Sequence, residues 1–353
     1  MKSGSLVLLF SVASMLCFTS SCSPTYIARA GWEEFKILRR RQPLDEAIAH
    51  SENSDISAKL QLVKKVRSFA KEQGLTPGGS FNSYSKVDRD VLVWVLSAAE
   101  KLSFTPLTWW FPIVGRVPYK GFFEKDDGLE AALALKDKGY DILLRPSAAF
   151  STLGWFNDPM LSTYINFDDV DLTNTVIHEL LHNTLWVKNH AEFNETLANF
   201  VGLQGAALYF DSIDINKKEA ALAECNINKS LIYSKMLAEL KAELDVVYQN
   251  KKLNNEDKLA QRETIFSNFI DRQEKIQTPG CERKRESTGG KAKINNALIL
   301  AHIVYHDRLW LFNDYFEKNS RRNLKVFISQ MKELADKANS SGKDPYELLQ
   351  NQS

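Results

Sequence analysis

The chain has almost no net charge, which excludes one class of partner. Its 353 residues include 45 Lys and Arg against 44 Asp and Glu, a formal net charge of +1. This length allows a substantial core, in one large domain or two smaller ones. A nucleic-acid-binding protein usually carries a basic excess that matches the phosphate backbone. We therefore expect no nucleic-acid partner.

Cysteine is scarce, with four in the chain and no CxxC pair. The missing pair excludes a cysteine-based zinc site. Cys17 and Cys22 lie in the N-terminal segment, which leaves Cys225 and Cys281. These two could form one disulfide in an oxidising compartment or remain free thiols, and their spacing leaves both readings open.

Long apolar runs are also scarce, and the one at the N-terminus is typical of an export signal. Lys2 supplies a positive start, residues 6–18 (LVLLFSVASMLCF) are apolar, and two serines follow at 20 and 21. The run is too short to span a bilayer comfortably as a permanent helix. We therefore predict a signal peptide over residues 1–21 and an exported protein.

Cys22, directly after that segment, predicts a lipid anchor. A cysteine that follows small residues here is typical of bacterial lipoproteins, which carry lipid on this thiol. Thr19 stands where such cleavage sites usually have Leu, so plain secretion is the alternative. We expect a membrane-anchored lipoprotein of the bacterial envelope, in the periplasm or at the cell surface. Three arginines at 39–41 are interpreted as a solvated helix face, with contact to anionic lipid headgroups as the alternative.

Proline and glycine are absent between Ile213 and Gln277. A segment this long without either residue, rich in Ala, Leu, Glu and Lys, predicts long amphipathic helices paired as a hairpin. Apolar spacing predicts helices elsewhere as well, over Ala28–Ala47, Ser57–Gln73, Ile294–Phe316 and Leu324–Ala338.

The stretch from residue 84 to 164 has a different composition and predicts the β part of the protein. Val91–Val95 and Ile142–Leu144 have the composition of strands. Between them, residues 108–123 (TWWFPIVGRVPYKGFF) predict short strands joined by tight turns. We interpret their aromatic side chains as core packing, with a substrate platform as the alternative.

These elements predict an α+β fold that is predominantly helical. A small mixed β region is followed by a zincin-like HExxH helix and a helical C-terminal half. We expect an N-terminal helical and β region over residues 22–165. A zinc-binding, helical region should follow over 166–353, with the two forming one continuous catalytic domain.

The motif HELLH, residues 178–182, predicts a metal site. Val176, Ile177, Leu180, Leu181 and Leu185 recur at helical intervals and predict a buried amphipathic helix. On it, His178 and His182 are separated by four residues, so one helical turn places both imidazoles on one face to bind a single Zn²⁺. We expect one zinc ion per chain.

A catalytic zinc needs a third protein ligand and one open position. The metzincin pattern would need Gly at 185 and His at 188, where the chain has Leu185 and Lys188. Glu195, at the start of a predicted second helix over Asn194–Leu208, is the favoured third ligand because two His and one Glu form a common hydrolytic set. His190 is the rival.

Two further side chains complete the predicted chemistry. Glu179 is rotated about 100° from His178 on the helix, so it stands beside the metal and can act as general base toward water. An oxyanion donor is also needed, and the last helices offer His302, Tyr305, His306 and Tyr315. We favour Tyr305 because a neutral phenol donates readily, and this requires its helix to return to the zinc.

HELLH followed by NETLA at 194–198 resembles the gluzincin peptidases, which include thermolysin and the large zinc aminopeptidases. The rest of the chain resembles a bacterial family of lipoprotein-like proteins named predicted aminopeptidases. That second resemblance rests on LRRRQPLDEAI at 38–48, WWFPIVGRVPYKGFF at 109–123, FSTLGWFNDPMLST at 150–163 and INNALI at 294–299. It implies a zinc aminopeptidase that acts on peptide substrates.

The chain departs from thermolysin at Asn199, which stands where that enzyme has an Asp that orients a ligand histidine. An amide oxygen can still accept an imidazole N–H, without the charge that raises ligand basicity. The alternative function is a non-catalytic zinc-binding lipoprotein that acts as an envelope scaffold. Glu179 weighs against it, since a structural site has no use for a general base.

Overall fold

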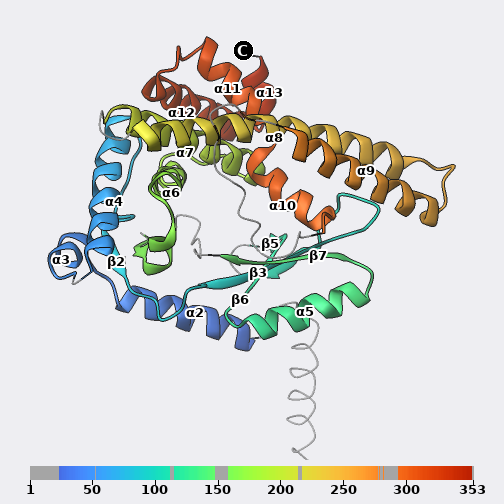
Figure 1. Ribbon diagram of the computed structural model, residues 1–353, viewed down its shortest axis with the longest axis horizontal. Helices are drawn as coiled ribbons and strands as arrows, with labels where there is room; N and C mark the ends of the chain where they lie inside the picture. The colour runs from blue at the N-terminus through green and yellow to red at the C-terminus, as the bar shows by residue number, and fades with distance from the viewer. Residues whose placement is uncertain are drawn as a thin grey trace, which may run out of the picture.

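The computed structural model describes residues 24–51, 53–111, 115–147, 158–213, 217–276, 278, 281 and 293–351 (Figure 1). The described residues are predominantly helical with a small mixed β region, which confirms the predicted fold class. The predicted signal peptide, Cys22 and most of the 150–163 segment lie outside the described residues. Among the described helices, none is long and apolar enough to cross a bilayer.

The elements follow one another in three groups. The first is α2 (Pro24–Arg39), β1 (Gln42–Pro43), α3 (Leu44–Ala49), α4 (Ser54–Glu72), β2 (Ser83–Ser85) and β3 (Val93–Ala99). The second is β4 (Trp109–Phe111), β5 (Gly115–Val117), β6 (Lys120–Phe122), α5 (Lys125–Asp137), β7 (Asp141–Ser147), β8 (Met160–Leu161) and the 3-10 helix η1 (Ser162–Asn166). The third is α6 (Asp169–His182), α7 (Ala191–Asp211), α8 (Lys217–Gln249), α9 (Asn255–Lys275), α10 (Asn296–His306), α11 (Leu309–Lys318), α12 (Leu324–Ser341) and α13 (Pro345–Gln350).

The strands form small sheets, of which β3, β6 and β7 lie in the middle of Figure 1 and β2 lies to one side, beside α3 and α4. In one sheet the order is β6-β3-β7, and both neighbours are antiparallel to β3. A second has the order β1-β2-β8, and β4 pairs with β5 as a hairpin. Figure 1 shows α2 and α5 on one side of these strands and α10 on the other, beneath α8 and α9. The β region thus lies between two helical layers.

One apolar core joins the N-terminal helices to the C-terminal half. The side chain of Asn53 caps the start of α4, and Leu60, Val63 and Val66 are buried at helical spacing along it. They belong to a cluster that extends through α6 and α7 to Leu349 near the C-terminus. Side chains from both sides of residue 165 therefore share one core. The division at 165 and 166 stays a prediction.

The predicted helical hairpin is confirmed. Helices α8 and α9 lie side by side and are joined by a short turn, as Figure 1 shows in yellow and gold. Leu240, Leu244, Phe266 and Phe269 are buried in the cluster between them and α10. The short strands predicted for residues 108–123 are also observed, as β4, β5 and β6.

Two predicted helices are wrong because each contains a break. The stretch Ala28–Ala47 is divided by β1, whose Gln42 pairs with Tyr84 of β2. The stretch Ile294–Phe316 is divided into α10 and α11, because Arg308 has a left-handed backbone with φ of 51°. Ser234 of α8 stabilises this break, since its hydroxyl accepts from the Leu309 N–H and donates to a carbonyl of α10.

Two predicted boundaries also differ. The strand predicted at Val91–Val95 begins at Val93 and continues to Ala99, because all seven residues of β3 pair with β7. The HExxH helix ends at His182, one turn before Leu185. Thr184 causes this end: its hydroxyl donates to the Leu180 carbonyl and accepts from the backbone of the 75–80 loop.

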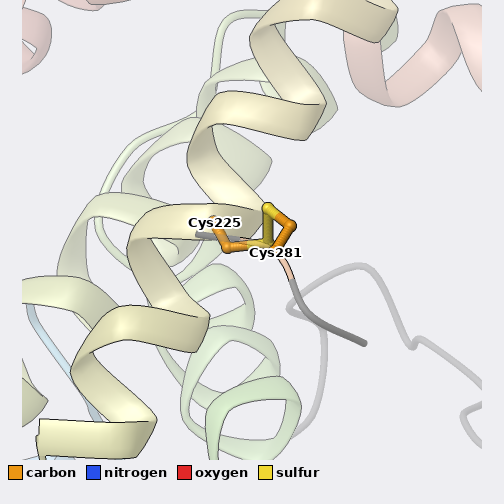
Figure 2. The surroundings of a disulfide bond; sticks show 2 residues. All are labelled: Cys225 and Cys281. Atoms are coloured by element: carbon orange, nitrogen blue, oxygen red, sulfur yellow. A yellow bond between two sulfur atoms is a disulfide. The ribbon is translucent and has the colours of Figure 1, made fainter. Parts of the chain in front are cut away.

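Cys225 and Cys281 form a disulfide, which answers the question that their spacing left open. Cys225 lies on α8 and is buried, and the two Cα atoms are 5.4 Å apart (Figure 2). The bond closes a segment that contains the α8–α9 hairpin.

Candidate metal centre

Helix α6 carries the HExxH motif and is fixed by burial and by its cap. The side chain of Asp168 accepts from the Asp171 N–H at the start of the helix. Val176, Ile177, Leu180 and Leu181 are buried on one side. Because His178 and His182 share a different face, both imidazoles project away from this packed side into a common space.

The turn after α6 is held by Asn194, the first residue of the NETLA segment. Its amide oxygen accepts from the Val187 N–H and its amide nitrogen donates to the Val187 carbonyl, both at 2.8 Å. Asn194 is 2% exposed, so these two bonds satisfy a polar group that would otherwise be costly to bury. The clamp sets where α7 begins and therefore where Glu195 projects.

Two glycines let α7 cross close to α6. A Cβ built on Gly202 would lie 2.1 Å from Oδ1 of Asn174, and one on Gly205 would lie 2.8 Å from Cδ1 of Ile177. Both distances are shorter than any non-bonded contact that carbon tolerates. The glycines thus permit the close approach that carries Glu195 toward the histidine pair.

The structure brings His178, His182 and Glu195 together. The two Nε2 atoms are 3.2 Å apart, and the carboxylate oxygens lie 3.3 Å from Nε2 of His178 and 3.5 Å from Nε2 of His182. In the described part of the chain, this trio is the cluster whose potential ligand atoms all lie within 4.8 Å of one another. His190, the rival third ligand, precedes α7 and is not in the cluster.

Electrostatics favour a positive charge at this point. Burial raises the pKa of Glu195, but hydrogen bonds from both imidazoles outweigh it and hold that pKa far below its usual range. Burial lowers the pKa of His178, but the hydrogen bond to Glu195 and the charge of Glu179 outweigh it and raise that pKa. The carboxylates therefore stabilise a cation among these side chains.

The donor set fits zinc. The Glu195 carboxylate can only accept, so each Nε2 that bonds to it must carry a proton, whereas a metal ion would be bound directly by the lone pairs of all three groups. Two nitrogen ligands about 2.0–2.1 Å from one tetrahedral zinc lie about 3.3 Å apart, close to the 3.2 Å observed between the Nε2 atoms. That these residues hold zinc stays a prediction.

Helix α10 returns to the site, as the choice of Tyr305 required. The ring centroids of Tyr305 and His178 are 6.2 Å apart. Burial and the negative charge of Glu195 raise the pKa of Tyr305 to about 12, although Arg145 opposes the shift. The phenol therefore keeps its proton at neutral pH and can donate it in a hydrogen bond.

Asn199 makes a contact that the sequence did not indicate. Its amide nitrogen donates to the Tyr305 carbonyl at 2.7 Å, and one turn earlier the Thr196 hydroxyl donates to the Val304 carbonyl. Both bonds run from α7 to the last turn of α10. Asn199 therefore fixes the backbone of Tyr305, and acceptance of an imidazole N–H stays a prediction.

At its other end α10 is anchored by Asn296, in the INNALI segment. This fully buried amide donates to the carbonyls of Glu100, Lys101 and Ser103, and its oxygen accepts from the Tyr248 hydroxyl. The bonds tie the start of α10 to the loop after β3. Held at both ends, α10 has a fixed path along the sheet to the metal centre.

Glu179 lies beside this cluster. Its negative charge helps to raise the pKa of His178. It also adds to the raised pKa values of Tyr305 and Tyr164, for which burial is the larger cause. Tyr164 belongs to η1 and is buried. Glu179 is thus next to His178 in sequence, and its charge acts on the phenol of Tyr305, as that of a general base paired with an oxyanion donor would.

Two further residues reach the site: Tyr119, from the aromatic segment, and Arg145, which no sequence pattern indicated. Tyr119 lies between β5 and β6; partial desolvation raises its pKa and the charge of Glu195 adds to this. Arg145 of β7 opposes the shifts of both Tyr119 and Tyr305. Trp110 and Tyr119 are 45% and 43% exposed, so for these two the core-packing interpretation was wrong. The aromatic segment itself was the available signal.

Comparison with known proteins gives one match. A family model described as “Putative aminopeptidase” matches residues 25–344, most of the chain. No curated protein and no solved structure matches this chain.

Proposed function

Because the chain belongs to the family described as “Putative aminopeptidase”, we propose that it is a zinc-dependent peptidase that removes residues from the N-terminus of peptides. The family description supports peptide-bond cleavage. The convergence of His178, His182 and Glu195 beside Glu179 is the observation that carries the zinc mechanism.

His178, His182 and Glu195 would hold the ion. A zinc ion in such a set polarises a carbonyl and brings the pKa of water to about 7. The trio would supply two neutral ligands and one anion from two helices, three protein ligands as in a catalytic zinc site. The Asn194 clamp and the T-shaped packing of His182 on Trp186, with ring centroids 5.5 Å apart, hold the ligands in place.

Glu179 accepts the proton of the attacking water. It projects about 100° around α6 from His178, so it can reach the water without entering the ligand set. The same carboxylate then returns the proton to the leaving amine. The neighbouring Tyr305 and Tyr164 keep their protons, and His178, His182 and Glu195 would be occupied by the ion, which leaves this transfer to Glu179.

Tyr305 donates a hydrogen bond to the oxyanion that forms when the peptide carbonyl is attacked. Because its pKa is raised to about 12, the phenol is neutral at the working pH and already carries the proton that it donates in the hydrogen bond. Arg145 lies near enough to lower that pKa, and its positive charge adds to oxyanion stabilisation. Tyr119, more exposed, is placed to contact the bound peptide.

We place this activity in the bacterial envelope, with the protein held to a membrane by lipid on Cys22. The apolar residues 6–18 and the cysteine that follows support export and lipidation. The Cys225–Cys281 disulfide supports an oxidising compartment, since such bonds are rare in reducing ones.

Glu179→Gln tests the mechanism. The change keeps the shape and polarity of the side chain, so zinc content and thermal unfolding should match the parent. Loss of the base should reduce peptide turnover by about 10²–10⁴-fold. Turnover is measured on a mixed peptide library, where loss of single N-terminal residues distinguishes an aminopeptidase from an endopeptidase.

Glu192→Gln is the matched control, because it makes the same chemical change on an exposed residue of α7. It should retain full activity. Parent-like turnover by Glu179→Gln would refute the general-base role. A parent protein that binds zinc but cleaves no peptide would favour the scaffold function instead.

A further inference from the structure

Helix α2 turns two large aromatic side chains into solvent. Trp32 is 58% exposed and Phe35 is 49% exposed, and their rings stack with centroids 5.6 Å apart. Ile37, on the same helix, is buried in the core. Trp32 and Phe35 lie about 160–220° around the helix from Ile37, so they face directly away from the body of the protein.

The charge on this face is positive. Arg39 shares the outward direction, and two more arginines follow it: Arg40, which pairs with Asp88, and Arg41. The acidic Glu33 is turned inward: its side chain is 15% exposed and pairs with Lys36 and Arg89. Trp32, Phe35 and Arg39, with the exposed Arg41 just beyond the end of the helix, are together called the outward face of α2.

The position of α2 in the chain and in the fold suits a membrane contact. The helix begins at Pro24, directly after the segment that contains the apolar residues 6–18 and Cys22. It lies along one side of the molecule, and α11, α12 and α13 lie at the opposite side (Figure 1). Whatever holds the N-terminus at a membrane would therefore bring this helix to the lipid surface first.

We propose that the outward face of α2 lies on an anionic lipid bilayer. Tryptophan and phenylalanine insert at the boundary between headgroups and acyl chains, while arginines contact lipid phosphates. Each basic side chain at an anionic surface strengthens such binding about fivefold. The contact orients the protein so that α2 rests on the membrane, and it is independent of the peptidase chemistry.

The test places the full chain on vesicles of phosphatidylethanolamine and phosphatidylglycerol whose acyl chains carry bromine, which quenches nearby tryptophan. The parent should lose fluorescence, and Trp32→Phe should abolish most of that loss. Trp110→Phe and Trp186→Phe are matched controls, since these tryptophans are 45% and 36% exposed and lie outside α2, in β4 and in the connection between α6 and α7. Both should be quenched like the parent.

A charge-reversed variant, Arg39→Glu with Arg41→Glu, separates the face from the N-terminal attachment. The variant should stay on the vesicles but lose the quenching of Trp32. Quenching of the parent should weaken on vesicles of phosphatidylcholine alone, which carry no net charge. Quenching that survives in Trp32→Phe or in the charge-reversed variant would overturn the proposal. A parent that is not quenched would overturn it as well. A soluble dimer that shields Trp32 from acrylamide would also overturn it, because that result would assign this face to a second copy of the chain.

Discussion

At the scale of single residues, the candidate centre depends on contacts that join two helices. His178 and His182 come from one turn of α6, and Glu195 comes from α7. Its carboxylate lies within 3.5 Å of both imidazole nitrogens, near the spacing that ligands of one zinc ion would have. Loss of any one ligand should therefore lower the affinity for metal.

We expect His182→Ala to abolish stoichiometric zinc binding and Glu195→Gln to weaken it, because a neutral amide replaces an anionic ligand. The measurement is zinc content by elemental analysis after dialysis against a weak chelator, together with peptide turnover. His190→Ala is the control and should keep one zinc per chain. Full zinc occupancy in His182→Ala would contradict the ligand assignment.

Tyr305→Phe should retain zinc and fold but reduce kcat by about 10²-fold, since it removes one oxyanion donor. KM should change little, because the donor acts mainly after the carbonyl is attacked. Tyr315→Phe is the control: Tyr315 is buried on α11, away from the centre, and its ring packs on Phe327. Equal kcat values for Tyr305→Phe and the parent would remove Tyr305 from the mechanism.

At the scale of elements, the close crossing of α6 and α7 determines whether the ligands meet. The glycines at 202 and 205 leave no room for a methyl group against Asn174 and Ile177. The Asn194 clamp fixes the turn that joins the two helices. The geometry of the centre is thus a consequence of helix packing as much as of the ligand side chains.

Gly202→Ala should lower the free energy of unfolding by about 1–3 kcal/mol, because the new methyl group overpacks the interface. It should also weaken zinc binding, since α7 must move Glu195 away from the histidines. Chemical denaturation and zinc titration measure the two effects. Gly31→Ala is the control, because nothing lies within 4 Å of its Cβ position. A Gly202→Ala protein as stable as the parent would contradict the packing argument.

At the scale of the whole molecule, the disulfide and the two clusters of buried side chains hold distant segments together. The bond between Cys225 and Cys281 spans a sequence separation of 56 residues and includes the α8–α9 hairpin. One apolar cluster joins α4 to α6 and α7, and the other joins the hairpin to α10, which carries Tyr305. Removing the disulfide should therefore act on global stability.

The double variant Cys225→Ala with Cys281→Ala should lower the free energy of unfolding by about 2–4 kcal/mol, because the unfolded chain gains conformational freedom. Zinc content at low temperature should not change, since neither cysteine lies in the metal cluster. The comparison is denaturation with and without reductant. Reductant should destabilise the parent and leave the double variant unaffected; equal sensitivity of both would exclude a structural disulfide.

The predominantly helical fold and the pairing of His178 with His182 could be predicted from the sequence because both depend on local periodicity. A helix places side chains four residues apart on one face wherever it forms, and α4 and the α8–α9 hairpin follow from apolar spacing and from the absence of Pro and Gly. The disulfide, the break at Arg308 and the division of the first helix by β1 depend on long-range partners, so local patterns left them open or missed them.

The sequence by itself determined that two imidazoles and one carboxylate on α6 share a turn of helix, because that arrangement is set by backbone geometry. Only the tertiary structure decided that Glu195 rather than His190 meets them, because the Asn194 clamp and the glycine crossing orient α7. It also decided that Tyr305 returns to the centre and that Tyr119 and Arg145 approach it, because these come from strands and helices distant in sequence. Their meeting depends on packing energies summed over the whole core, which no local pattern encodes.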